Sequence, residues 1–190
     1  MHITVAPGVY VVGGTSITDE SDCTTLVACS LTDPPTCALI GCGSGRSLHA
    51  LVRNLMELGI SIKHVRYAII PLVLDCVASG CRYLKEAFRW ILLCAPPSIA
   101  RMLREGASGT PIPISMEASE VPLDDDVKIH VKVLDPRSKA LITVSRRGRA
   151  LSMLLMSSSI EAIEDLEAKG VNRIICLLEE PTCRRLGGFR

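Results

Sequence analysis

Apolar residues in the first forty positions fall into four short runs separated by turns. Residues 2–12 contain two runs rich in β-branched residues, one on each side of a Pro-Gly turn. Residues 24–29 and 37–41 form two further runs, joined by an Asp-Pro-Pro turn. The pattern predicts an antiparallel meander of strands at the start of the chain.

The spacing of apolar residues then changes. After a glycine-rich turn at residues 41–47, apolar positions recur every three or four residues until Gly59, which predicts a helix ended by a glycine. An apolar strand at 65–70 follows. The alternation continues with a helix at 81–89, a strand at 91–95 and a helix at 97–105. It predicts a largely parallel sheet with helical crossovers, and therefore an α/β fold.

The second half of the chain begins with a loop rich in Gly, Pro and Asp at residues 106–126. Residues 127–134 alternate apolar and polar side chains, which is typical of a half-exposed strand. Further elements are predicted as strands at 141–144, 150–156 and 172–178, a helix at 160–169, and a frayed polar tail at 179–190.

Composition adds limits on function. Apolar residues make up 48% of the chain, enough for a core, but only six residues are aromatic. The net charge of +1 and the scarcity of aromatic side chains argue against nucleic-acid binding and against an anionic membrane surface. No signal peptide or spanning segment is recognisable, so a soluble, cytoplasmic protein is expected.

Nine cysteines are present, several of them inside apolar strand patterns. For a cytoplasmic protein, reduced thiols that pack as small apolar groups are the expectation. The C-x4-C spacings of Cys37 with Cys42 and of Cys76 with Cys81 differ from the C-x2-C spacing typical of structural zinc sites.

Candidate chemistry gathers after the strand at 65–70. Pro71 ends that strand, and Asp75 and Cys76 are expected in the loop that follows. The carboxyl ends of strands are where α/β proteins place their ligands. The sequence therefore predicts a candidate site around Asp75 and Cys76.

Short motifs over much of the chain resemble the metallo-β-lactamase superfamily. They are Ala-Pro-Gly-Val-Tyr at 6–10, Thr-Thr-Leu-Val at 24–27, Cys-Ala-Leu-Ile-Gly-Cys-Gly-Ser-Gly at 37–45, Arg-Tyr-Ala-Ile-Ile at 66–70 before Leu74-Asp75, Ile-Leu-Leu-Cys-Ala at 91–95, and Val-Pro-Leu-Asp-Asp-Asp-Val-Lys-Ile at 121–129. The resemblance implies a metallo-β-lactamase-like domain over residues 1–134. Residues 135–190 would be a degenerate second half or an appended αβ segment, which leaves the family's αβ/βα sandwich incomplete.

The resemblance also implies a changed metal site. The family's His-x-His-x-Asp-His motif places its three histidines on Pro71, Val73 and Cys76 and keeps only Asp75. Neither Pro nor Val can bind a metal. Of the family's later ligand positions, one falls on Arg137 and another near Glu179, and no Gly-Asp pair stands at residues 150–157.

Two weaker resemblances point elsewhere. The glycine loop Gly41–Gly45 resembles that of S-adenosylmethionine-dependent methyltransferases, and would make the chain an S-adenosylmethionine-binding protein. Residues 148–180 resemble the start of cysteine-dependent phosphatases, but Cys183 lacks the His-Cys-x5-Arg spacing that the nucleophile needs.

The resemblance leads to two hypotheses. In the first, the chain is a degenerate metallo-β-lactamase-fold protein without metal-dependent hydrolysis or a cofactor, acting as a binding or structural subunit or having no function of its own. Exposed sheet would then favour a homo-oligomer or a protein partner. In the second, a residual hydrolase binds zinc or another divalent metal through Asp75, Cys76 and Glu179, with Asp75 catalytic.

Overall fold

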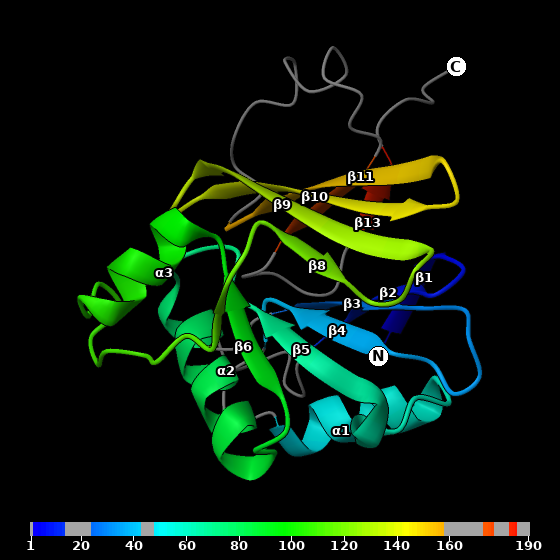
Figure 1. Cartoon of the computed structure of the whole chain (residues 1–190), viewed down its shortest axis with the longest axis horizontal. Helices are drawn as coiled ribbons and strands as arrows, with labels where there is room; N and C mark the ends of the chain where they lie inside the picture. The colour runs from blue at the N-terminus through cyan, green and yellow to red at the C-terminus, as the bar shows by residue number, and fades with distance from the viewer. Residues whose placement is uncertain (1, 14–23, 43–47, 158–172, 177–182, 186–190) are drawn as a thin grey trace.

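Two stacked β-sheets with helices on one side form the molecule (Figure 1). The computed structural model of the 190-residue chain describes residues 2–13, 24–42, 48–157, 173–176 and 183–185, the last two ranges as backbone only. The strands of the first sheet are β1 (His2–Ala6), β2 (Val9–Val12), β3 (Thr25–Cys29), β4 (Cys37–Ile40), β5 (Val65–Ile69), β6 (Leu92–Ala95) and β7 (Met116–Glu117). The strands of the second are β8 (Glu120–Pro122), β9 (Val127–Asp135), β10 (Lys139–Arg146), β11 (Arg149–Met156), β12 (Arg173–Cys176) and β13 (Cys183–Arg185).

The first sheet follows the predicted order. Strands β1 to β4 pair antiparallel, and β4 to β7 pair parallel, in the order β1-β2-β3-β4-β5-β6-β7. The crossovers are the helices α1 (Leu48–Glu57), α2 (Asp75–Ala87) and α3 (Pro97–Arg104), with a short 3-10 helix, Ile62–His64, before β5. The meander and the β-α-β units expected from the sequence are thereby confirmed.

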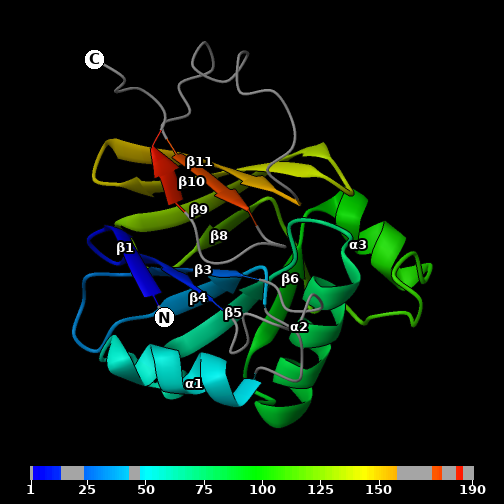
Figure 2. The same cartoon turned by 180° about the vertical axis from the view of Figure 1, so that it is seen from behind.

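The second sheet lies over the face of the first sheet that α1 and α2 leave free, as the view from behind also shows (Figure 2). Its order is β13-β12-β11-β10-β9-β8. Alternate residues of β9 and β10 are buried between the sheets, among them Ile129 and Ile142, which are fully buried. These side chains join Leu39 and Ile69 of the first sheet in one continuous core. The hydrophobic effect of this shared core holds the two sheets together.

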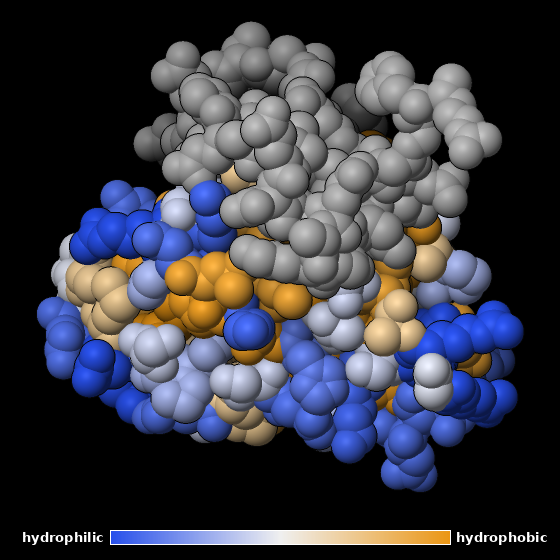
Figure 3. Space-filling view, turned by 90° about the horizontal axis from the view of Figure 1, so that it is seen from above, coloured by the Kyte–Doolittle hydropathy of each residue, from blue (hydrophilic) through white to orange (hydrophobic). Residues whose placement is uncertain are grey.

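The outer face of the second sheet is less apolar than its inner face, but it is not purely polar. Leu141 of β10 is half-buried there, its partner Leu154 on β11 is buried, and Leu134 of β9 is 44% exposed. Seen from above, polar residues lie around the rim of the described surface and apolar ones nearer its middle (Figure 3).

Helix α2 begins earlier than the sequence pattern suggested. The expected helix covered residues 81–89, with Asp75 in a loop, whereas Asp75 is the first residue of α2. A Ser-Gly pair in this stretch favoured a loop, since both residues are weak helix formers. Burial overrides that preference, because Val77, Cys81 and Leu84 lie four and three residues apart and are all fully buried.

Other short elements were also missed. The loop expected at 106–126 contains the two-residue strand β7 and the three-residue strand β8. The tail expected to be frayed contains β13, which pairs antiparallel with β12. Such short strands carry too few residues for an alternating pattern to stand out. The helix predicted at 160–169 lies outside the described residues.

Candidate functional site

The segment after β5 runs into the interior instead of out to solvent. Pro71, Leu72 and Val73 are all buried, and Val73 is only 5% exposed. The Val73 backbone N–H donates a hydrogen bond of 2.7 Å to the carbonyl oxygen of Pro136. This bond joins the segment after β5 of the first sheet to the turn between β9 and β10 in the second sheet.

The β9–β10 turn is organised by Asp135. Its Oδ1 accepts hydrogen bonds from the backbone N–H groups of Arg137 at 2.8 Å and Ser138 at 2.9 Å. The Arg137 N–H bond, followed by a bond from the Ser138 side chain, holds the pKa of Asp135 below its ordinary value because both stabilise the carboxylate. The Ser138 carbonyl in turn accepts from the N–H of Ser157, just after β11, at 2.9 Å.

These bonds bring three segments of the sequence together: the stretch after β5, the turn at 135–138 and the end of β11. They are the segments onto which the resemblance aligned metal ligands. Strand ends that converge at one edge of an α/β structure are a usual place for a site. The backbone scaffold of the candidate site is therefore present.

Asp75 follows this buried segment as an exposed residue in the first turn of α2. A carboxylate is favoured there by the partial positive charge of the helix N-terminus. Its side chain forms no ion pair or hydrogen bond with another described residue, while its backbone carbonyl accepts from Ser79 Oγ at 2.7 Å. The Asp75 carboxylate thus faces solvent.

The cysteines differ from the expectation of reduced thiols. Cys29 and Cys37 are joined by a disulfide with a Cα–Cα distance of 4.1 Å. Cys42 and Cys81 are joined by a second, at 5.2 Å. Cys76 is disulfide-bonded as well. The expectation was wrong for these five residues because it was drawn from the assumed compartment, not from which cysteines the fold places side by side.

The sequence contained a sign of one of these disulfides. Cys29 and Cys37 flank the turn of the predicted hairpin, and in the structure they face each other in the β3–β4 register. Directly opposed residues of an antiparallel pair are close enough for a cross-strand disulfide. The Cys42–Cys81 pair joins distant segments, so sequence spacing gave no sign of it. Among the described residues whose side chains are placed, Cys94 is the free cysteine, and burial raises its pKa to about 12.

The described residues do not fit a zinc ion. Zinc is held by several N, S or O ligands. Pro71 has no side-chain donor atom, Val73 is aliphatic and buried, and a sulfur in a disulfide, as in Cys76, is not a thiolate. Among the described residues, no three His, Cys, Asp or Glu side chains lie close enough together to hold a metal ion. Glu179 and most of the Gly41–Gly45 loop lie outside the described residues.

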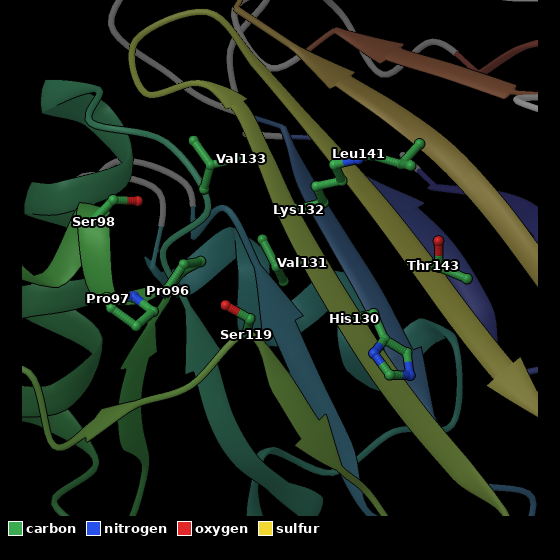
Figure 4. A pocket seen from close by; sticks show the side chains of 10 residues that line it. All are labelled: Pro96, Pro97, Ser98, Ser119, His130, Val131, Lys132, Val133, Leu141 and Thr143. Atoms are coloured by element: carbon green, nitrogen blue, oxygen red, sulfur yellow. The ribbon is translucent and has the colours of Figure 1, made fainter. Parts of the chain in front are cut away.

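A separate hollow of about 540 Å³ lies between the start of α3 and the second sheet (Figure 4). Pro97 and Ser98 form one side, and His130 and Lys132 of β9 stand on the other. His130 Nδ1 lies 3.3 Å from a Glu120 carboxylate oxygen. The sequence placed His130 and Lys132 on the exposed face of a strand, but gave no sign that α3 would border them.

Comparisons with known proteins bear on the fold. No protein-family model and no curated protein matches the chain. A metallo-β-lactamase from Cronobacter sakazakii with mutations in its HARLDQ motif is 17% identical, with a TM-score of 0.66 over 92% of this chain and 79% of that one. BJP-1, a subclass B3 metallo-β-lactamase of Bradyrhizobium japonicum, is 13% identical, with a TM-score of 0.63 over 93% and 76%.

FEZ-1 from Legionella gormanii is 10% identical, with a TM-score of 0.63 over 85% of this chain and 65% of that one. A likeness that spans 92% of the chain extends beyond residue 134, so it includes part of the second sheet. The described helices include none long and apolar enough to cross a membrane. Taken with the two-sheet architecture, these likenesses show that the chain has the metallo-β-lactamase fold.

Proposed function

We propose that this chain is a metallo-β-lactamase-fold protein that does not carry out metal-dependent hydrolysis and acts instead as a binding or structural protein. The observation that carries the proposal is the burial and backbone hydrogen bonding of Val73. Its side chain is buried in the core, and its backbone N–H is bonded to Pro136 at 2.7 Å. A position packed in this way contributes to stability and offers no atom to a metal.

The neighbouring positions support the same conclusion. Pro71 is buried and carries no donor, and Cys76 is disulfide-bonded. Asp75 is left as a single exposed carboxylate. One carboxylate binds a divalent metal weakly in water, because tight sites need several ligands in a fixed geometry.

A structural role would be exerted through contact with other chains. A homo-oligomer or a protein partner is the form we propose. Light scattering of the purified protein measures this directly. A stable monomer at high protein concentration would leave only the protein-partner form of the proposal.

The exposure of Asp75 favours a second candidate, a residual hydrolase that binds a divalent metal at this carboxylate. Metal analysis separates the two. The full chain is dialysed against zinc, then against metal-free buffer, and its metal content is measured by mass spectrometry. The proposal predicts well under one zinc per chain for the unaltered protein and for Asp75→Ala alike.

Asp125→Ala is the matched control, since it removes another exposed carboxylate far from this segment in the sequence. Zinc bound at one ion per chain, lost in Asp75→Ala and kept in Asp125→Ala, would overturn the proposal in favour of the residual hydrolase. Hydrolysis of a β-lactam or thioester probe that depends on Asp75 would do the same.

A further inference from the structure

Strand β4 is covalently tied at both ends. Cys37, its first residue, is bonded to Cys29 of β3, and Cys42, two residues past its last, is bonded to Cys81 of α2. Since β4 is the middle strand of the first sheet, the two bonds form one covalent path from β3 through β4 to α2. The path leads to the helix on which Asp75 stands.

Helix α2 is anchored twice in its N-terminal half. Cys76 occupies its first turn and Cys81 its second, and both are disulfide-bonded. Asp75 directly precedes the first anchor. The start of α2, where Asp75 stands, is therefore fixed by covalent bonds.

The second of these bonds has the features of a structural disulfide. Cys42 and Cys81 are 1% and 0% exposed, and their Cα–Cα distance of 5.2 Å is within the usual disulfide range. A thiolate must reach a sulfur atom to reduce a disulfide, so burial protects this one in the folded protein. The bond closes a segment of 39 residues, which restricts the unfolded chain considerably.

We propose that disulfides, and not a bound metal, hold the candidate site together, and that the chain therefore matures in an oxidising compartment. The part that concerns metal rests on the proposed function. Each bond forms when two thiols give up two protons and two electrons to a disulfide oxidant, which leaves as a dithiol. Such bonds form and persist in secretory and periplasmic compartments and are rare in the reducing cytosol.

Peptide mapping tests whether the bonds form. The chain contains no Lys or Arg before Arg46, and residues 67–82 form a second tryptic peptide. After free thiols are blocked and the protein is digested without reductant, peptide 1–46 should be recovered joined to peptide 67–82. Because peptide 67–82 also contains Cys76, fragmentation of the joined peptides should place Cys42 opposite Cys81, with neither residue carrying the blocking group. Recovery of both Cys42 and Cys81 as blocked thiols from protein made under oxidising conditions would overturn the proposal.

Stability tests the role of the bond. The Cys42→Ala/Cys81→Ala variant should unfold at a temperature lower by about 10 °C, following from the length of the closed loop. Hydrogen exchange in α2 should rise in this variant, with little change in β9 and β10. Cys29→Ala/Cys37→Ala is the matched control, because it removes a short-range bond that does not touch α2. It should leave exchange in α2 unchanged.

A chelator separates this proposal from the proposed function. Excess EDTA should leave the unfolding temperature of the unaltered protein unchanged, whereas adding a dithiol reductant during unfolding should lower it. A fall with EDTA alone would overturn the proposed function and the metal part of this inference. Equal stability of the Cys42→Ala/Cys81→Ala variant would overturn the disulfide part only.

The compartment is tested by expression. Soluble, correctly bonded protein should be recovered from the bacterial periplasm and largely lost from a reducing cytosol. Equal yields of the fully bonded protein from both would overturn the compartment part of the proposal.

Discussion

The hydrogen bond of 2.7 Å from the Val73 N–H to the carbonyl oxygen of Pro136 connects the two halves of the fold at the candidate site. Val73 follows β5 of the first sheet, and Pro136 lies in the turn between β9 and β10 of the second. A backbone hydrogen bond at this junction holds the segment after β5 against the β9–β10 turn. The buried Val73 side chain stabilises the same junction by packing in the shared core.

Introducing a histidine at this point should destabilise the fold. Val73→His would place a polar ring at a side-chain position that is 5% exposed, at a cost of about 2–4 kcal/mol in the free energy of unfolding. Urea unfolding of both proteins measures the difference. Leu134→His puts the same ring on a residue that is 44% exposed and should change stability by less than about 0.5 kcal/mol. An unchanged stability in Val73→His would show that the junction is looser than the structure indicates.

Arg146 makes a second connection between the sheets. Its Nη1 donates to the Pro7 carbonyl at 2.9 Å and its Nη2 to the Cys29 carbonyl at 3.2 Å. Gly8 makes room for it, since a Cβ there would lie 2.9 Å from Nη2 and 2.8 Å from the Cys29 oxygen, on a residue with a φ of +71°. Arg146→Ala should therefore cost about 1–3 kcal/mol in unfolding free energy.

The adjacent Arg147 provides the matched control. It pairs with Asp126 at 2.7 Å, but its side chain is 79% exposed, and exposed ion pairs contribute little. Arg147→Ala should therefore leave the midpoint of urea unfolding nearly unchanged. If the two alanine variants lose equal stability in urea, the two carbonyl bonds of Arg146 are not the source of its contribution.

Much of the fold was predictable because its elements have strong local patterns. The meander, α1 and the β9-β10-β11 region each combine clear alternation or helical spacing with glycine or proline turns. The start of α2 was not predictable from the sequence. The preference of Ser79 and Gly80 for a loop competes there with the burial of one helix face. Only the packed structure shows that burial prevails.

The place of Asp75 and Cys76 in the fold was predictable, but their surroundings were not, and their role as a site stays a prediction. The carboxyl end of the strand at 65–70 marked the place, and Asp75 and Cys76 are there. The Val73–Pro136 and Ser157–Ser138 bonds join residues far apart in the sequence, and no local pattern encodes such pairings. The same holds for Cys42 and Cys81, which lie 39 residues apart.

Asp135 should make stability depend on pH at the acid end. Its pKa in the folded protein is lowered, mainly by the Arg137 N–H bond, so its carboxylate stabilises the fold above the pKa of the unfolded chain. That contribution is lost as the pH falls through the lowered pKa. Asp135→Asn should therefore unfold at a lower temperature than the unaltered protein at pH 7, and the difference should shrink at pH 2. A difference that is the same at both pH values would contradict this role.

Cys94 should be unreactive until the protein unfolds. Burial raises the pKa of its thiol to about 12, and the thiolate is the reactive form. At pH 8 about one thiol in ten thousand is then ionised, and the buried position keeps reagents away from it as well. Tryptic peptide 90–101 contains Cys94 and no other cysteine, so its labelling by a maleimide is measured separately from that of the remaining thiols. The peptide should stay unlabelled in native protein and become fully labelled in 6 M guanidinium chloride. Rapid labelling in native protein would mean that the sheet opens readily around β6.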